Sequence, residues 1–147
     1  MALSKIPSEM QEALVAEDIP ITRNYAVSDA TAITVNSASP TTIAAVTLTT
    51  TGGPVLLVAT GDANPNQTGG WNWYQFYRGS TAIGKKVLNE NAGAISINGA
   101  WANTTIDVPS AGTYSYQIRA WQGTGSMTYG ETGNTQAPTI CAVELVK

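Results

Sequence analysis

The sequence predicts an all-β fold, a β-sandwich with a short N-terminal helix or extended arm. Three observations predict it. From about residue 31, short segments alternate apolar and polar residues, which is the period of a β-strand. Clusters of Gly, Pro, Asn and Ser separate these segments and mark turns. A helical period occurs only before residue 20, and about ten short strands without a second helix indicate a sandwich.

Residues 1–30 are predicted to form a helical anchor and a linker. Ser8 follows Pro7 and precedes Gln11 by three residues, which fits a helix N-cap with its capping box. The apolar residues at near-helical spacing are Ile6, Met10, Leu14 and Val15. An isolated helix of about ten residues is marginal in water, so this one needs a docking surface on its domain, a sister chain or a larger assembly. Residues 21–29 are interpreted as the linker.

Residues 31–147 are predicted to form the sandwich. The strands are expected at residues 32–35, 42–49, 55–60, 71–78, 81–88, 94–98, 104–108, 112–121, 127–130 and 139–146. Their many threonines suit half-exposed pleated surfaces. Cys141 lies in the last of these strands, where we expect a small buried hydrophobe rather than a reactive thiol.

Two of the expected strands carry aromatic residues in alternation. In residues 71–78, one face presents Trp71, Trp73, Gln75 and Tyr77, and the opposite face presents Asn72, Tyr74, Phe76 and Arg78. In residues 113–121, Tyr114, Tyr116, Ile118 and Ala120 share one face, and Arg119 and Trp121 are on the other. An exposed aromatic face is a liability unless a partner covers it. We therefore expect one face to meet the core and the other to meet a neighbouring subunit.

The chain lacks most of the residues from which catalytic and metal sites are built. It contains no His, one Cys and 12% charged residues. Hydrolytic, metal and redox sites use His, Cys or clustered carboxylates, so the sequence predicts a non-enzymatic protein without a cofactor or metal. Asp107 and Glu131 are a possible acid pair, but the sequence sets no nucleophile or base beside them.

Charge and hydropathy argue against two classes of partner. The net charge is −3, and from residue 19 onward basic and acidic residues balance. Such a neutral body offers no electrostatic surface for nucleic acid or an anionic membrane. No apolar segment approaches the roughly 20 residues that span a bilayer, and no signal-peptide pattern opens the chain. We expect the protein to be made in a cytoplasm, and we expect it not to insert into a membrane.

The stretch from about Val46 to the C-terminus resembles a jelly-roll module of small virion proteins of tailed phages, especially aquatic ones. The segments that carry the resemblance are VTLTTTGGPVLLVATGDANPN, WNWYQFYRGSTAIGKKV, DVPSAGTYSYQIRAW, TYGETGN and ICAVEL. RGSTAIGK and PSAGTYSYQIRA are its most specific parts, because order and spacing agree. The module is similar to the trimeric jelly rolls of complement globular heads and tumour-necrosis-factor-like proteins. The opening MALSKIPSEM and the later SDATAITVNSAS are similar to the openings of small phage tail-fibre and particle-surface proteins.

This resemblance implies a homotrimer on the exterior of a phage particle, without enzyme activity or a cofactor. Tyr114 and Tyr116 match the strand whose aromatic residues often face the threefold axis, and Trp73 and Tyr77 are expected to join them in the trimer interface. The alternative for Tyr114 and Tyr116 is packing inside the core of their own chain. The N-terminal arm would dock on another virion protein, either a tail or adaptor protein or the major capsid protein. Its anchoring residues would be Ile6, Met10, Leu14 and Val15.

Within that class, a small tail fibre or receptor-binding knob is the first hypothesis, since no coiled-coil or collagen-like stalk precedes the module. The alternative is a capsid decoration, or cement, protein that stabilises the head. A further alternative is a carbohydrate-binding module, in which aromatic rings stack on the sugars of a host glycan. The candidate contacts are Trp101, Trp121 and Tyr129, and Trp101, beside a predicted turn, is expected to be the most exposed.

Overall fold

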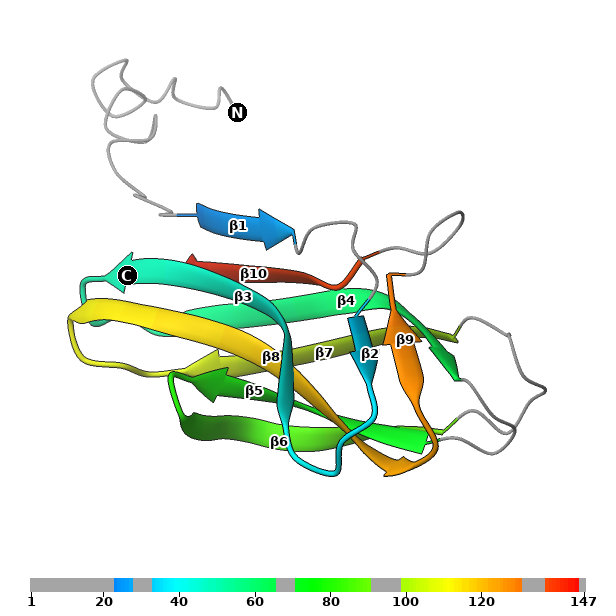
Figure 1. Ribbon diagram of the computed structural model, residues 1–147. Helices are drawn as coiled ribbons and strands as arrows, with labels where there is room; N and C mark the ends of the chain where they lie inside the picture. The colour runs from blue at the N-terminus through cyan, green and yellow to red at the C-terminus, as the bar shows by residue number, and fades with distance from the viewer. Residues whose placement is uncertain (1–22, 28–32, 66–70, 91–98, 131–136, 146–147) are drawn as a thin grey trace, which may run out of the picture.

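The computed structural model describes residues 23–27, 33–65, 71–90, 99–130 and 137–145 (Figure 1). These residues form ten strands and, within the described ranges, no helix. The strands are β1 (Arg23–Val27), β2 (Ile33–Val35), β3 (Thr41–Thr50), β4 (Val55–Pro65), β5 (Trp71–Arg78), β6 (Thr81–Glu90), β7 (Gly99–Asp107), β8 (Gly112–Thr124), β9 (Met127–Tyr129) and β10 (Thr139–Glu144). The expected helix, with Ile6, Met10, Leu14 and Val15, lies outside the described residues.

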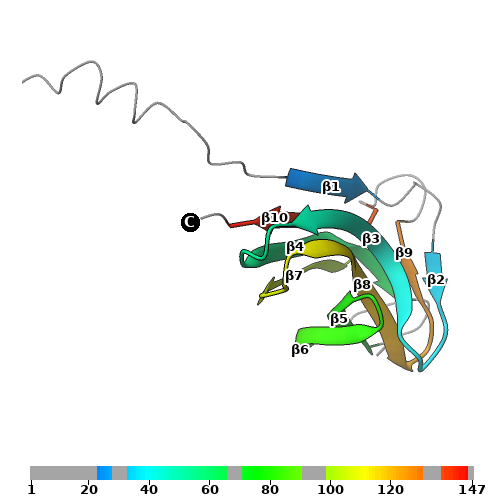
Figure 2. The ribbon, with the colours of Figure 1, turned by 90° about the vertical axis from the view of Figure 1, so that its left-hand side faces the viewer.

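The strands form two sheets that pack face to face. The six-stranded sheet has the order β1-β10-β4-β9-β2, with β7 paired to the other side of β4. The four-stranded sheet has the order β3-β8-β5-β6. The chain passes between the sheets from β3 to β4, from β4 to β5, from β6 to β7 and from β7 to β8, whereas β5 and β6 are neighbours in the four-stranded sheet; Figure 2 shows the two layers from the side. This arrangement is a jelly roll and confirms the predicted fold class.

The six-stranded sheet begins earlier than the sequence predicted. Residues 23–27, interpreted as part of a linker, form β1 and pair antiparallel with β10, from Arg23 opposite Val143 to Val27 opposite Thr139. β10 is paired with β4 on its other side. The backbone groups of residues 23–27 therefore complete the hydrogen bonding of β10, which overrides their weak local strand pattern.

Two strands are longer than the sequence predicted. β4 continues beyond Thr60 to Pro65, because residues 61–63 pair with the start of β7 and residues 63–65 pair with β9. β7 begins at Gly99 rather than at residue 104 for the same reason. The strand expected at residues 94–98 falls outside the described residues. The remaining strands occur within a few residues of their expected positions.

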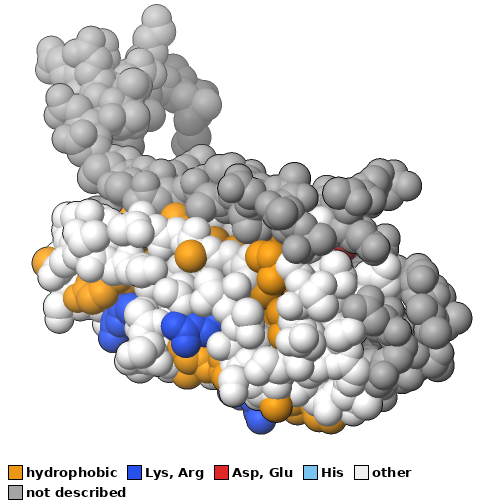
Figure 3. Space-filling view, viewed as in Figure 1, with side chains coloured by type: hydrophobic (Ala, Val, Ile, Leu, Met, Phe, Trp, Pro, Cys, Tyr) orange, Lys and Arg blue, Asp and Glu red, His pale blue; other side chains and the backbone are white. Residues whose placement is uncertain are grey.

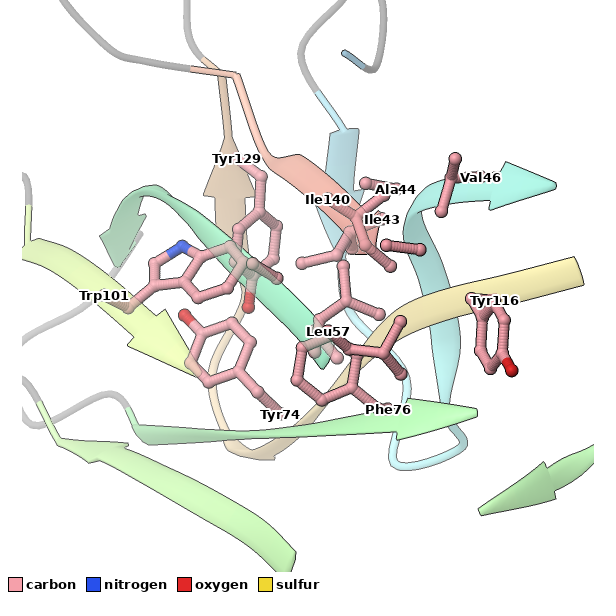
Figure 4. Packing of buried hydrophobic residues seen from close by; sticks show 14 of the residues in the cluster. Ile43, Ala44, Val46, Leu57, Tyr74, Phe76, Trp101, Tyr116, Tyr129 and Ile140 are labelled. Atoms are coloured by element: carbon pink, nitrogen blue, oxygen red, sulfur yellow. The ribbon is translucent and has the colours of Figure 1, made fainter. Parts of the chain in front are cut away.

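The core fills the space between the sheets. Along β10 every second residue is buried, and β3 keeps the same alternation over most of its length. Leu57 from the six-stranded sheet and Phe76 from the four-stranded sheet are both enclosed in this layer (Figure 4). Tyr74, Trp101 and Tyr129 form the aromatic end of the core, where their rings point toward one another.

Candidate functional site

One end of the outer surface of β10, β4 and β7 is apolar. Val143 on β10 pairs with Leu56 on β4, and Leu56 pairs with Ile106 on β7, so the three side chains form a row across the sheet. Ile106 is 58% exposed and Val108, two residues further, is 71% exposed. We call this surface the apolar face. It consists of Leu56, Val58, Ile106, Val108, Val143 and Leu145.

Cys141 lies beside the apolar face rather than inside the core. It pairs with Val58 in the register of β10 and β4, and it is half-buried. The expectation of a buried thiol is wrong because β10 buries Ile140 and Ala142 and turns the residues between them outward. Exposed apolar residues that gather on one sheet mark an interaction surface more often than isolated ones do.

The outer surface of the four-stranded sheet has a different character, with three half-buried tryptophans. Trp73 on β5 lies directly opposite Trp121 on β8. Trp71 meets Trp73 edge-on, with ring centroids 5.8 Å apart and planes at 89°. The Lys86 ammonium, from β6, lies 4.3 Å from the centroid of the Trp73 ring. Figure 3 shows Lys and Arg side chains among apolar side chains on the part of this surface that faces the viewer.

A second cation covers the other aromatic residue of this surface. The Arg119 guanidinium lies 4.3 Å from the centroid of the Tyr77 ring. It is held there because its Nε donates to Gln117 Oε1 at 2.8 Å and its Nη2 donates to the Gly79 carbonyl at 2.8 Å. Lys86 and Arg119 thus cover rings that sequence reasoning expected a sister chain to cover. The role of Trp73 and Tyr77 in a trimer interface stays a prediction.

Trp71 owes its position to a glycine on the neighbouring strand. A Cβ added to Gly123 would lie 1.8 Å from Trp71, so the indole rests directly on the backbone of β8. The register between β5 and β8 shifts at this point, between Trp71 and Asn72. The bare glycine and the irregular register together keep the Trp71 ring on the outer surface.

Tyr114 and Tyr116 lie on the inner side of the four-stranded sheet. Tyr116 is 0% exposed, and its hydroxyl donates to Asp107 Oδ2 at 3.0 Å. Burial, reinforced by this hydrogen bond, raises the pKa of Tyr116. Tyr116 is enclosed by its own chain, so the prediction that its ring faces a threefold axis is wrong. Tyr114 is half-buried and packs against the same core, with the Arg78 guanidinium 5.2 Å from its ring centroid.

Trp101 and Tyr129 are core residues, so the prediction that they contact a glycan is wrong. Trp101 is 7% exposed because β7 begins at Gly99 and places it inside a strand rather than beside a turn. Its ring stacks on Tyr74 at 4.4 Å between centroids and 16° between planes. Tyr129 is 0% exposed, receives a hydrogen bond from Asn72 Nδ2, and has a pKa raised by burial. Trp121 alone of the three lies on an outer surface.

A buried carboxylate, which sequence reasoning missed, holds the turn between β3 and β4. Glu144 Oε1 accepts hydrogen bonds from the Thr50 hydroxyl at 2.6 Å, from Thr51 N–H and hydroxyl at 2.9 Å each, and from Gly53 N–H at 2.8 Å. The Thr50 hydroxyl, helped by the backbone donors and opposed by burial, lowers the pKa of Glu144 to about 2. The sequence predicts a turn between the strands expected at residues 42–49 and 55–60, but it does not show that Glu144 binds this turn.

Asp107, one member of the possible acid pair, is engaged by an arginine. Asp107 binds Arg78 through an Nη1–Oδ2 contact of 2.9 Å, and Glu131, its expected acid partner, lies outside those residues. The described part of the chain holds no group of three or more His, Cys, Asp or Glu side chains that could bind a metal ion. Nor does it include a helix long and apolar enough to cross a membrane.

The fold is that of a jelly roll of the tumour-necrosis-factor type. The solved structure of Eiger TNF from S. frugiperda aligns with a TM-score of 0.56 and 9% identity, over 87% of this chain and 94% of that chain. At that identity the likeness shows the fold alone. No family model matches the sequence, and no curated protein matches it.

Two further solved structures align less well. One is the C-terminal CBM6 of LamC, a marine laminarinase from Zobellia galactanivorans, with a TM-score of 0.32 and 12% identity, over 78% of this chain and 100% of that chain. The other is the enzymatically active domain of bacteriophage CBA120 tailspike protein 4, with a TM-score of 0.33 and 15% identity. That alignment covers 81% of this chain and 19% of the tailspike chain.

Proposed function

We propose that this chain forms a homotrimer on the exterior of a phage particle and acts there as a small, non-enzymatic receptor-binding knob. The single observation that supports the proposed trimer is the exposed apolar face. Ile106 and Val108 expose most of their apolar surface to water in the single chain, and their neighbours across β4 and β10 are apolar as well. Burial of such surface stabilises an assembly by about 25 cal/mol per Å².

The fold supports three copies in particular. Jelly rolls of the tumour-necrosis-factor type typically form homotrimers, and this chain shares their fold. A closed ring uses one surface of each copy against a different surface of the next, so no apolar face stays open to further growth. The proposed interface lies on the six-stranded sheet, whereas sequence reasoning placed it on aromatic residues of the four-stranded sheet.

The phage setting is supported by the resemblance of the sequence segments to small virion proteins. In this setting the protein is made in the host cytoplasm, and residues 1–30 attach the knob to another virion protein. Low charge and the absence of His support a structural role rather than an enzymatic one. Capsid decoration is the second role that this setting allows, because a trimer can also sit at the threefold points of a shell.

The trimer is tested with the purified full chain by light scattering coupled to size-exclusion chromatography. The expected mass is three copies. Ile106→Asp should give a folded monomer, because the interface would have to bury three carboxylates. Leu88→Asp is the matched control, since Leu88 is 44% exposed but lies on β6 of the other sheet. A monomeric wild-type chain at high concentration, or a trimeric Ile106→Asp, would contradict the proposal.

The location is tested by imaging whole particles with an antibody raised against the sandwich. Label at the tip of the tail or its fibres supports the knob, and label spread over the head supports decoration. Deletion of the gene separates the two roles further. A knob predicts particles that assemble normally but do not adsorb to the host, whereas a decoration protein predicts heads with lower heat resistance. Unlabelled particles would contradict both.

A further inference from the structure

The outer surface of β8, β5 and β6 brings half-buried indoles and cationic side chains together. Trp121, Trp73 and Lys86 lie on three adjacent strands, and Trp71 is the next outward residue along β5. We infer that this surface, which we call the indole face, binds an acidic polysaccharide. Sugar rings stack on the indoles, and their carboxylates or sulfates meet Lys86 and Arg119. The inference deepens the proposed receptor-binding role, and it rests on that role only for its biological setting.

The charges around the indole face suit an anionic ligand. Residues 41–50, 71–78, 81–88 and 112–124 of the four-stranded sheet contain no Asp or Glu. Their charged residues are Arg78, Lys85, Lys86 and Arg119. Glu90 ends β6 opposite Trp71 in the register, at the rim of the face. A surface with one sign of charge attracts ligands of the opposite sign, although the whole chain carries −3.

The carboxylates with described side chains either bind other groups of the chain or belong to the other sheet. Asp107 is bound to Arg78, and Glu144 is enclosed by the turn between β3 and β4. Asp62 belongs to β4 of the other sheet. Lys86 and Arg119 make no ion pair among the described residues, where Arg78–Asp107 is the salt bridge present. Aromatic rings therefore hold the two cations in place, and no carboxylate among the described side chains forms an ion pair with either of them.

Two indoles lie beside the cation that covers Trp73. Lys86 lies over the Trp73 ring, so Trp71 and Trp121 are the indoles that flank this cation, one along β5 and one across on β8. The planes of the Trp71 and Trp73 rings are at 89° to each other, and Trp71 packs directly against Gly123. Flat apolar rings with polar edges stack well on the C–H faces of a sugar. A saccharide that carries a carboxylate can stack on Trp71 or Trp121 and place its carboxylate beside the Lys86 ammonium.

Nucleic acid is the competing anionic ligand, and the face suits it less. Binding of a nucleic-acid strand draws on many phosphate contacts from a basic stripe. The indole face offers two oriented cations, Lys86 and Arg119, on a chain with a net negative charge.

The test uses the full chain and five polymers: polygalacturonate, dextran sulfate, neutral dextran, polyglutamate and a single-stranded oligonucleotide. Affinity electrophoresis and the change in tryptophan fluorescence report binding. We expect polygalacturonate or dextran sulfate to bind, with an affinity that falls as salt is added, and neutral dextran to bind at least tenfold more weakly. Equal binding of polyglutamate or of a single-stranded oligonucleotide would overturn the inference, because either would show a non-specific polyanion effect. Binding of none of the polymers would overturn it as well.

Two variants locate the site. Trp121→Thr should weaken binding about tenfold, and Lys86→Gln should weaken it several-fold. Lys85→Gln is the matched control, because Lys85 is an exposed neighbour with the same charge, and its variant should bind like the wild type. Equal losses for Lys86→Gln and Lys85→Gln would contradict the site. A trimer that binds no acidic polymer contradicts this inference alone, and a monomer that binds one contradicts the proposed trimer alone.

Discussion

The Glu144 carboxylate holds the backbone N–H of Thr51 between its two oxygens, with Oε1 at 2.9 Å and Oε2 at 3.1 Å. The two residues are 93 positions apart in the chain. Glu144 ends β10 of the six-stranded sheet, and Thr51 follows β3 of the four-stranded sheet. One buried side chain therefore ties the turn after β3 to the opposite sheet.

The Glu144 carboxylate predicts how the stability of the fold falls at acidic pH. The pKa of Glu144 is about 2 in the folded chain, below its ordinary value of 4.5. A lowered pKa means that the ionised group stabilises the fold fully above pH 4.5, and that this stabilisation is lost as the pH falls toward 2. Glu144→Gln should be less stable than the wild type at neutral pH, and the difference should shrink between these two values. Thermal unfolding at a series of pH values checks it, and a constant difference would contradict it.

Two buried tyrosines predict that the fold loses stability at alkaline pH. Burial raises the pKa of Tyr116 and of Tyr129 above the ordinary value of 10.0. Groups with a raised pKa stabilise the fold fully below pH 10.0, and this stabilisation is lost as the pH rises above it. The two phenols should ionise only together with loss of the β-sheet circular dichroism. Phenolate absorbance measures this, and Tyr129→Phe should remove one phenol from the late phase. Early ionisation of all tyrosines in a folded chain would contradict it.

The Asp107 carboxylate should stabilise the contact between the sheets. Its Oδ2 accepts from Arg78 on β5 at 2.9 Å and from the Tyr116 hydroxyl on β8 at 3.0 Å. Asp107→Asn should lower the free energy of unfolding by about 2 kcal/mol, because both donors lose a charged acceptor. Denaturant unfolding measures this. A double-mutant cycle with Arg78→Met isolates the pair, and a coupling free energy near zero would show that the contact is not stabilising.

Trp101 should behave as a core residue. Trp101→Ala should lower the free energy of unfolding by about 3–5 kcal/mol, since it removes the stacking partner of Tyr74 and leaves a cavity. Trp121→Ala is the comparison, and it should cost much less because Trp121 is half-buried on an outer surface. The denaturant midpoints of the two variants check this order. Equal losses would show that the two indoles are buried to the same degree.

Residues 1–20 should be needed for attachment rather than for folding. β1 begins at Arg23, so a chain that lacks residues 1–20 keeps every strand of the described sandwich. The shortened chain should retain its β-sheet circular dichroism and lose cosedimentation with phage particles. Full-length protein added to particles that lack it is the control. Loss of the β-sheet signal in the shortened chain would show that the segment is part of the core.

The alternation of β5 and β8 was readable from the sequence, but the role of each face was not. A period of two separates Trp73 from Tyr74 and Tyr116 from Arg119, and the structure keeps both separations. The period does not say which face meets the other sheet. Tyr116 was assigned outward and lies inward, because β8 packs between β3 and β5 with that face toward the six-stranded sheet.

By itself, the sequence determined the class of fold, the place of most strands and the low content of catalytic residue types. These properties depend on local period, turn residues and composition, all of which are read within a short window. Only the tertiary structure decided that Ile106 is exposed, that Lys86 and Arg119 cover aromatic rings, and that Glu144 caps a turn far away in the chain. Those contacts join strands that are distant in sequence, and they exist only once the two sheets have a fixed register and stacking.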